Sequence, residues 1–437
     1  MPLPNPVIVV PGITASGLRD EYVVSPEIVW SAVLNKDYGR LTLHPDDLRY
    51  ELEEPARIGV DEILKTAYSH LIHELRHNLT ERRDSPVPVY PFPYDWRHPL
   101  DLIEEQLECF VQEVIGRTKL MRHYHANGYA KDPKVDLVGH SMGGLIIAGY
   151  LQRLGEEAAV GKVATLGTPF RGSFEAPLKV ITGTSSLDGD MPAVSAERVA
   201  ARLTPALYHL IPSFENAIQA PPSLPNDLYT VETWQEGVIK TLAEFIREHG
   251  LKGGNAAKRK SQAKELLGGI LQRAKGHRDR VEALQLGQAG LEHDAWLCLV
   301  GVDSTTRVRL KIEKKGGKPF FNLTGNDRLN DWDHSDPQQH IFTGDGTVPY
   351  LGAEPSFLGR ENLVCLRPDD FGYWEIADKV LLRVAGFHAI LPRLNLAQRL
   401  IISHLRGKPT KGIWGRPAPG ISNSEWSPPI KNLKNKA

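Results

Sequence analysis

The sequence has almost no excess of charge of either sign. Its 437 residues include 52 Lys and Arg against 53 Asp and Glu, which gives a formal net charge of −1. Proteins that bind nucleic acid through their surface field carry a clear positive excess. The composition therefore gives no reason to expect a nucleic-acid partner.

Long apolar runs are also missing. No segment approaches the roughly 18 uninterrupted apolar residues of a membrane-spanning helix. The opening MPLPNPVIVVPG lacks a basic leading region, and its apolar run is only long enough for a strand. This start does not fit a secretory signal peptide. We therefore expect a soluble, cytoplasmic protein.

Cysteine is scarce. Cys109, Cys298 and Cys365 are odd in number, and each lies within an apolar run. They predict buried free thiols in a reducing compartment, with neither a disulfide nor a metal site. No motif in the sequence indicates a metal or an organic cofactor.

Short apolar runs rich in β-branched residues alternate with longer helical patterns. We predict strands at residues 7–10, 87–90, 135–138, 163–166, 296–302 and 363–366. Apolar residues at helical spacing predict one helix between the first and second strands and another between the second and third. A last helix near 394–405 would close the final face. This alternation is typical of a mostly parallel sheet flanked by helices.

Two connections are too long for a minimal sheet of this kind and predict insertions. The first spans 14–57. The second, 173–292, has helical patterns without a convincing strand and predicts a helical cap or lid. The core would then comprise 1–172 and 293–407, followed by an irregular tail at 408–437. The basic stretch at 252–284 favours a solvated helix over a patch for anionic membranes.

One segment of the cap carries an apolar face. The run ARLTPALYHLIPSF favours two interpretations equally, a lid over an acyl pocket or the core of the cap itself. Its apolar residues at helical spacing are Leu203, Leu207, Leu210 and Ile211.

The run VDLVGHSMGGLIIAGYL places a serine between glycines where a strand pattern ends and a helix pattern begins. Gly-His-Ser-Met-Gly at 139–143 matches the Gly-x-Ser-x-Gly nucleophile elbow in the structural context that the elbow requires. Such a sharp turn needs neighbours almost without side chains, and it lifts the hydroxyl above the carboxyl edge of the sheet. Ser141 is therefore the candidate nucleophile.

A serine hydroxyl needs a base, and the base needs an acid to orient it. In this kind of fold the acid and then the base follow the serine along the chain. Asp345 in the tight turn of FTGDGTVPY and His388 in VAGFHAILPRLN satisfy that order. We prefer them to four competing residues in a solvated loop or on a helix side, namely Asp331, Asp333, His334 and His404.

The tetrahedral oxyanion of an acyl transfer needs two amide donors. The amide of Met142 follows the serine directly. The second amide comes from the loop after an early strand, and the strand that ends at Pro11-Gly12 makes Ile13 the natural donor.

These motifs together resemble the lecithin:cholesterol acyltransferase family, which includes phospholipid:diacylglycerol acyltransferases and bacterial lipase-like relatives. The matching elements are VIVVPGI, PYDWR, GHSMGG, LGTPFRGS, GDGTVP and the closing segment from a histidine into a helix. PYDWR is the most discriminating, because generic esterases lack it. The resemblance implies an α/β-hydrolase fold with a large inserted helical cap or lid, and it assigns the triad and oxyanion roles to the residues named above.

The resemblance also bears on Asp95, Trp96 and Arg97 in PYDWR. We favour a structural role, in which an Asp–Arg pair beside a tryptophan locks neighbouring loops, over a contact to a substrate headgroup. By this resemblance, the first insertion of this chain would correspond to the family's membrane-contacting region and the long insertion to its cap-plus-lid region, so transient contact with a membrane surface is an expectation. The signal peptide and disulfide of the secreted members are not visible here.

The sequence therefore predicts a serine-dependent lipid acyl hydrolase or acyltransferase that works through an acyl-enzyme, with a lipid or other ester as its partner. Two other functions stay open. One is a soluble esterase that acts on non-lipid esters. The other is a non-catalytic interaction protein on the same scaffold, against which the intact Ser, Asp and His argue.

Overall fold

The computed structural model describes residues 3–32, 35–43, 58–184, 195–249, 254–324, 327–372, 375, 378, 385–408 and 410–436. Six parallel strands form a central sheet in the order β15-β10-β8-β7-β1-β6. All six predicted strands lie in this sheet. They are β1 (Val7–Val10), β6 (Val89–Pro91), β7 (Val135–His140), β8 (Val160–Leu166), β10 (Trp296–Gly301) and β15 (Leu363–Leu366).

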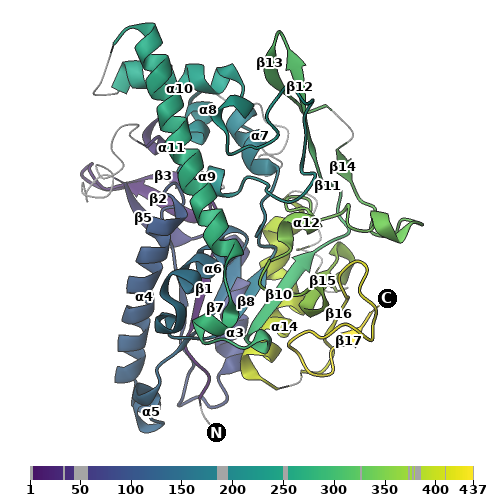
Figure 1. Cartoon of the computed structure of the whole chain (residues 1–437). Coiled ribbons are helices and arrows are strands. Elements are labelled where there is room, and N and C mark those ends of the chain that lie inside the picture. The colour runs from purple at the N-terminus through teal and green to yellow at the C-terminus, as the bar shows by residue number, and fades with distance from the viewer. Residues whose placement is uncertain are drawn as a thin grey trace.

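Helices cover both faces of this sheet (Figure 1). In β1, Val7 and Val9 pack on one face with α3 (Lys65–Leu79) and α14 (Asn395–Arg406). Ile8 and Val10 pack on the other face with α4 (Leu100–Leu120) and α6 (Met142–Leu154). Because side chains alternate along a strand, burial on both faces requires the continuous apolar runs seen in the sequence. The predicted fold class, an α/β-hydrolase fold, is confirmed.

The long insertion forms a helical cap with its own apolar core (top of Figure 1). Its short strand β9 (Ile218–Gln219) pairs with β12 (Leu310–Lys315), which follows β10 in the chain and also pairs with β13 (Lys318–Asn322). Strands from beyond the expected cap thus complete the cap core. The cap helices are α7 (Glu175–Thr182), α8 (Ser195–Arg202), α9 (Pro205–His209), α10 (Glu236–His249) and α11 (Ala256–Glu282).

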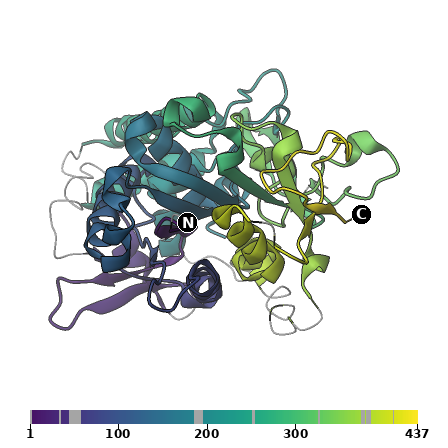
Figure 2. The same cartoon turned by 90° about the horizontal axis from the view of Figure 1, so that it is seen from below.

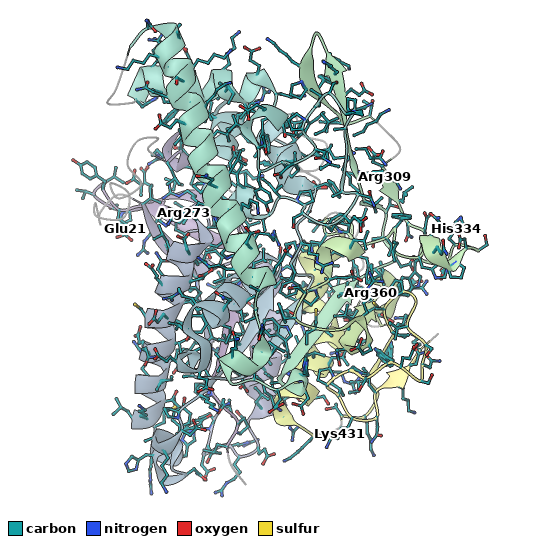
Figure 3. All side chains as sticks on the ribbon, in the orientation of Figure 1. Glu21, Arg273, Arg309, His334, Arg360 and Lys431 are labelled. Atoms are coloured by element: carbon teal, nitrogen blue, oxygen red, sulfur yellow. The ribbon has the colours of Figure 1, made fainter. Side chains whose placement is uncertain are left out.

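The helix α11 runs from the cap down to the core and carries most of the basic stretch (Figure 1). Arg273, labelled in Figure 3, pairs with Asp101 of α4 at 2.7 Å. Lys260 pairs with Glu236 at 2.7 Å. These side chains therefore contribute contacts within the protein. Residues 252 and 253 of the predicted basic stretch lie outside the described residues.

Three strands of the first insertion and β5, which directly follows it, form a four-stranded antiparallel sheet in the order β4-β3-β2-β5, which the sequence did not predict. Figure 2 shows this sheet and the C-terminal segment on opposite sides of the molecule. The part of the insertion at 33–34 and 44–57 lies outside the described residues. The strands are β2 (Ser16–Asp20), β3 (Glu27–Ser31), β4 (Asn35–Lys36) and β5 (Ile58–Ile63).

The C-terminal segment after α14 is mostly irregular but packs on the sheet edge. The indole N–H of Trp426 donates to the carbonyl of Leu363 at 2.8 Å, and the amide of Cys365 donates to the carbonyl of Arg416 at 2.8 Å. Two short strands, β16 (Trp414–Gly415) and β17 (Lys434–Asn435), pair within it.

One cysteine prediction is wrong. Cys298 and Cys365 are buried, but Cys109 is exposed. The buried stripe of α4 runs through Ile103, Leu107, Val111 and Val114, and the helical period turns position 109 away from it. Among the residues that the structure describes, none of the helices combines the length and the apolar character needed to cross a bilayer.

Candidate active site

Ser141 occupies a strained turn between β7 and α6. Its backbone has φ 54° and ψ −128°, in a region that non-glycine residues rarely adopt. Its amide donates to the carbonyl of Leu166 on the neighbouring strand at 2.9 Å. A side chain at position 143 would collide with the carbonyl of Val10, and one at position 139 would come within 2.8 Å of the amide of Gly144. The glycines of the motif therefore allow the turn to close.

Ser141, His388 and Asp345 form a continuous hydrogen-bonded chain. Oγ of Ser141 lies 2.9 Å from Nε2 of His388, and Nδ1 of His388 lies 2.7 Å from Oδ2 of Asp345. The three residues are 7%, 4% and 1% exposed, respectively. Because a carboxylate only accepts hydrogen bonds, Nδ1 carries the proton, and Nε2 presents its lone pair to the serine hydroxyl. This is the tautomer that a general base needs.

The two oxygens of Asp345 have separate partners. Oδ1 accepts hydrogen bonds from the amides of Thr347 and Val348 at 3.0 and 2.7 Å. Oδ2 is thereby directed at His388. The amide of His388 also donates to the carbonyl of Asp345 at 3.1 Å. The turn therefore fixes both the carboxylate and the backbone of the histidine.

The competing residues lie elsewhere. His334 is exposed and projects at the right edge of Figure 3, in the same loop as Asp331 and Asp333. His404 on α14 is buried, and its Nε2 lies 3.0 Å from the carbonyl of Val163. None of the four lines the cavity at Ser141.

The two expected oxyanion donors flank the serine. Met142 is the first residue of α6, so its N–H is one of the helix-start groups that lack an intrahelical acceptor. Ile13 follows Gly12, and Gly12 lies so near the serine that a Cβ there would come within 2.9 Å of Cβ of Ser141. Ile13 also lines the cavity above Ser141.

A cavity of about 260 Å³ opens at Ser141 and His388. Residues from the first insertion, α3 and the cap line it, and its wall is mainly apolar. Two residues of the expected apolar face in the cap, Leu207 and Leu210, line the cavity, whereas Leu203 and Ile211 pack in the cap core. The face is therefore divided between the cavity wall and the cap core, and its role as a lid over an acyl pocket stays a prediction. Other apolar lining residues include Trp30, Leu41, Trp96 and Ala176.

Charged side chains interrupt the apolar wall at Lys36, Glu175, Lys179 and Glu197. Nζ of Lys179 lies 2.6 Å from Oε1 of Glu197, which also accepts a hydrogen bond from the Tyr38 hydroxyl at 2.7 Å. The contact joins α1 (Tyr38–Leu41) of the first insertion to α7 and α8 of the cap. The two insertions thus meet over the cavity.

The PYDWR motif contributes one residue to the cavity wall. Trp96 lines the cavity, and its indole N–H donates to the carbonyl of Ser16 at 3.2 Å. The guanidinium of Arg97 donates to both carboxylate oxygens of Asp95 and to the carbonyl of Leu41 at 3.2 Å. Burial raises the pKa of Asp95, but the charges of Arg97 and His98 together with the hydrogen bonds from Arg97 outweigh it and bring the pKa to about 2. The pair thus ties the strand-end loop to the first insertion.

Sequence reasoning missed two buried residues beside the candidate triad. The Tyr68 hydroxyl of α3 lies 2.7 Å from Nδ1 of His140, and Nε2 of His140 lies 3.0 Å from the carbonyl of His388. Burial is the main cause that lowers the pKa of His140 well below its usual range, and the nearby His388 lowers it further. Position 140 is unspecified in Gly-x-Ser-x-Gly, so the motif gave no signal for it.

Residues 60–262 match the lecithin:cholesterol acyltransferase family. This range includes Ser141 but neither Asp345 nor His388. No curated protein matches the chain.

Among solved structures, a chain of the crystal structure of a Tle4–Tli4 complex matches with a TM-score of 0.61 and 14% identity, over 94% of this chain and 100% of that one. Two further matches have much lower TM-scores. Phospholipase PlaB from Legionella pneumophila gives 0.24 at 14% identity, over 56% of this chain and 37% of that one. The mature lipase BlEst2 from Bacillus licheniformis gives 0.19 at 15% identity, over 57% and 76%.

Proposed function

We propose that this α/β-hydrolase, whose residues 60–262 match the lecithin:cholesterol acyltransferase family, cleaves lipid esters through a covalent acyl-enzyme on Ser141. The observation that carries this proposal is the hydrogen-bonded chain from Ser141 through His388 to Asp345, which opens onto a largely apolar cavity. A nucleophile, a base and an orienting acid in this order are the parts of serine acyl transfer.

In the first step, Nε2 of His388 takes the proton of the Ser141 hydroxyl while Oγ attacks the ester carbonyl. The carbonyl π electrons move onto oxygen, and the amides of Ile13 and Met142 donate hydrogen bonds to the resulting oxyanion. Each donor stabilises the transition state by about 3 kcal/mol. His388 then protonates the leaving alcohol as its bond to the carbonyl carbon breaks. Asp345 keeps the imidazole in the required tautomer and stabilises its cation.

In the second step, an acceptor hydroxyl attacks the acyl-enzyme. His388 takes the acceptor's proton and returns it to Oγ of Ser141 as the serine ester breaks. Water as acceptor gives hydrolysis, and an alcohol gives acyl transfer. The same geometry supports both reactions, because each requires only a hydroxyl oxygen within reach of Nε2.

The cavity wall supports a lipid ester as the substrate. Burying each methylene of an acyl chain contributes roughly 0.8 kcal/mol, and Trp30, Trp96, Leu207 and Leu210 offer an apolar surface for such a chain. A small polar acyl group would leave this surface in contact with water.

The experiment uses p-nitrophenyl esters of increasing chain length with the wild type and with Ser141→Ala. Preference for long chains that Ser141→Ala abolishes supports the proposal. Ser403→Ala is the matched control, because Ser403 is buried on α14 and bonds only the carbonyl of Lys408 among the described residues. This variant should keep full activity.

Two other outcomes would contradict the proposal. Preference for short chains would indicate an esterase for non-lipid substrates. No serine-dependent turnover, together with no labelling of Ser141 by a fluorophosphonate, would indicate a non-catalytic protein. The mass of the adduct on Ser141 after incubation with a lipid extract would identify the natural acyl group.

A further inference from the structure

A buried chain of hydrogen bonds runs beside the proposed triad, and Gly12, Tyr68 and His140 also line the cavity. The amide of Gly12 lies 2.9 Å from the Tyr68 hydroxyl oxygen, which lies 2.7 Å from Nδ1 of His140. Nε2 of His140 lies 3.0 Å from the backbone carbonyl of His388. The chain links the loop after β1, the helix α3, the end of β7 and the loop that carries the histidine of the triad.

The direction of every bond in this chain is determined. The amide of Gly12 can only donate, so the Tyr68 oxygen accepts there and uses its single proton toward Nδ1 of His140. Nδ1 is then an acceptor, and the proton of a neutral imidazole must be on Nε2. This proton points at the carbonyl of His388, which can only accept. One arrangement of protons therefore satisfies all three bonds.

The chain holds the backbone of the proposed triad histidine through a contact separate from those of Asp345. The amide of His388 donates to the carbonyl of Asp345, while its own carbonyl accepts from His140. The two peptide groups that flank the Cα of His388 are thus fixed by contacts that do not involve its imidazole. Tyr68 and His140 are 1% and 5% exposed, so water does not offer competing partners.

We propose that Tyr68 and His140 are positioning residues, which hold the oxyanion loop and the backbone of His388 in register with Ser141. The proposal rests on the serine mechanism above. Neither residue exchanges a proton with substrate. Tyr68 acts on Ile13 through the amide of Gly12, and His140 acts on the imidazole of His388 through its carbonyl.

The neutral state of His140 is part of this role. In an imidazolium, Nδ1 of His140 would also carry a proton. It could then no longer accept the hydrogen bond from the Tyr68 hydroxyl. The imidazolium would also place a charge beside His388, whose ring centroid lies 5.0 Å away and which becomes a cation during each proton transfer. The burial that keeps His140 neutral therefore favours turnover.

The first test compares Tyr68→Phe with Tyr150→Phe. Tyr150 is an equally buried tyrosine whose hydroxyl donates to the carbonyl of Ala158 at 2.7 Å, away from the site. Both variants lose one buried hydroxyl, so Tyr150→Phe controls for the general effect of removing such a group on thermal stability. Tyr68→Phe should lower kcat by about 10- to 100-fold with KM nearly unchanged, because misplacement of reacting groups by about 1 Å costs up to ~100-fold. Tyr150→Phe should leave kcat unchanged.

The second test uses His140→Leu and His140→Gln. Leucine removes both bonds and should reduce kcat as Tyr68→Phe does, whereas glutamine can accept and donate at once and should retain most activity. Tyr68 contacts His388 only through His140. The loss of kcat caused by Tyr68→Phe should therefore be smaller when it is measured in the His140→Leu background. Equal kcat values for Tyr68→Phe and Tyr150→Phe, or additive effects with no rescue by glutamine, would overturn the proposal.

The outcomes separate this inference from the proposed function. If Ser141→Ala retains full turnover, the serine mechanism fails and the inference fails with it. If turnover requires Ser141 but not the Tyr68 hydroxyl, only the positioning role fails. Melting temperatures of all variants distinguish loss of folded protein from loss of rate.

Discussion

Nε2 of His388 lies 2.9 Å from Oγ of Ser141, although the two residues are 247 positions apart in the sequence. The contact exists because β7 and β10 belong to one parallel sheet and their carboxyl ends meet at one edge. Ser141 follows β7, and the turn of Asp345, which holds His388, lies beside the end of β10. A site of this kind exists only in the folded chain.

Asp345→Asn should lower kcat by about 10⁴-fold with the fold intact. The carbonyl oxygen of the amide can still accept from Thr347 and Val348, which leaves its NH₂ group toward Nδ1 of His388. The imidazole then carries its proton on Nε2 and has no lone pair for the serine. Steady-state kinetics on a p-nitrophenyl ester measures the loss. Activity within tenfold of the wild type would contradict the assigned role of Asp345.

Gly143→Ala should destabilise the protein by roughly 1 to 3 kcal/mol and abolish labelling by a fluorophosphonate. The added methyl group meets the carbonyl of Val10 and forces the elbow to shift. Gly116→Ala is the matched control. Gly116 lies exposed within α4 and has no neighbour near a new Cβ, so alanine there should stabilise the protein by about 1 kcal/mol. Urea unfolding measures both changes, and similar effects would refute the steric argument.

Ala176→Phe should shift the chain-length preference toward short esters. Ala176 is buried on α7 and lines the cavity, so a phenyl ring there takes the space of several methylenes. We expect kcat/KM on long-chain esters to fall by about tenfold or more, while the rate on acetyl esters stays unchanged. An equal loss of rate on long-chain and acetyl esters would indicate that the acyl chain does not bind beside Ala176.

Asp95 should contribute to acid unfolding. Its pKa is about 2 in the folded protein, below the 3.8 of a free side chain. A depressed pKa gives stability that is complete above about pH 4 and is lost as the pH falls toward 2. The shift corresponds to about 2 kcal/mol. In urea unfolding, the stability difference between the wild type and Asp95→Asn should therefore shrink between pH 5 and pH 2.5. A constant difference would rule out this coupling with Arg97.

Much of the core was predictable because each of its signals is local. A strand buried on both faces needs a continuous apolar run, and 7–10 and 363–366 match β1 and β15 to the residue. The elbow is a pattern of five consecutive residues, and the order of acid and base is a rule of the fold. The candidate triad could be named before any distance was known, although its catalytic role stays a prediction, as do the two oxyanion donors.

The features that sequence reasoning missed depend on contacts between distant segments. β2 pairs with β3 and β5 with register shifts, so the period of two that marks a strand is interrupted. Tyr68 and His140 are 72 positions apart, and each alone has the pattern of an ordinary buried residue. The division of the chain at residue 292 stays a prediction.

The pairing of β9 with β12 has a consequence for synthesis of the chain. Ile218 lies opposite Leu310, and the amide of Leu310 donates to the carbonyl of Ala217 at 2.8 Å. The cap helices α10 and α11 lie between these two strands in the chain, so they are synthesised before β12. The core strand β10 is also synthesised between α11 and β12. Apolar side chains such as Leu267 and Leu271 therefore stay incompletely buried until residues up to 322 have been synthesised. During this interval chaperones can bind the nascent chain, and it can aggregate.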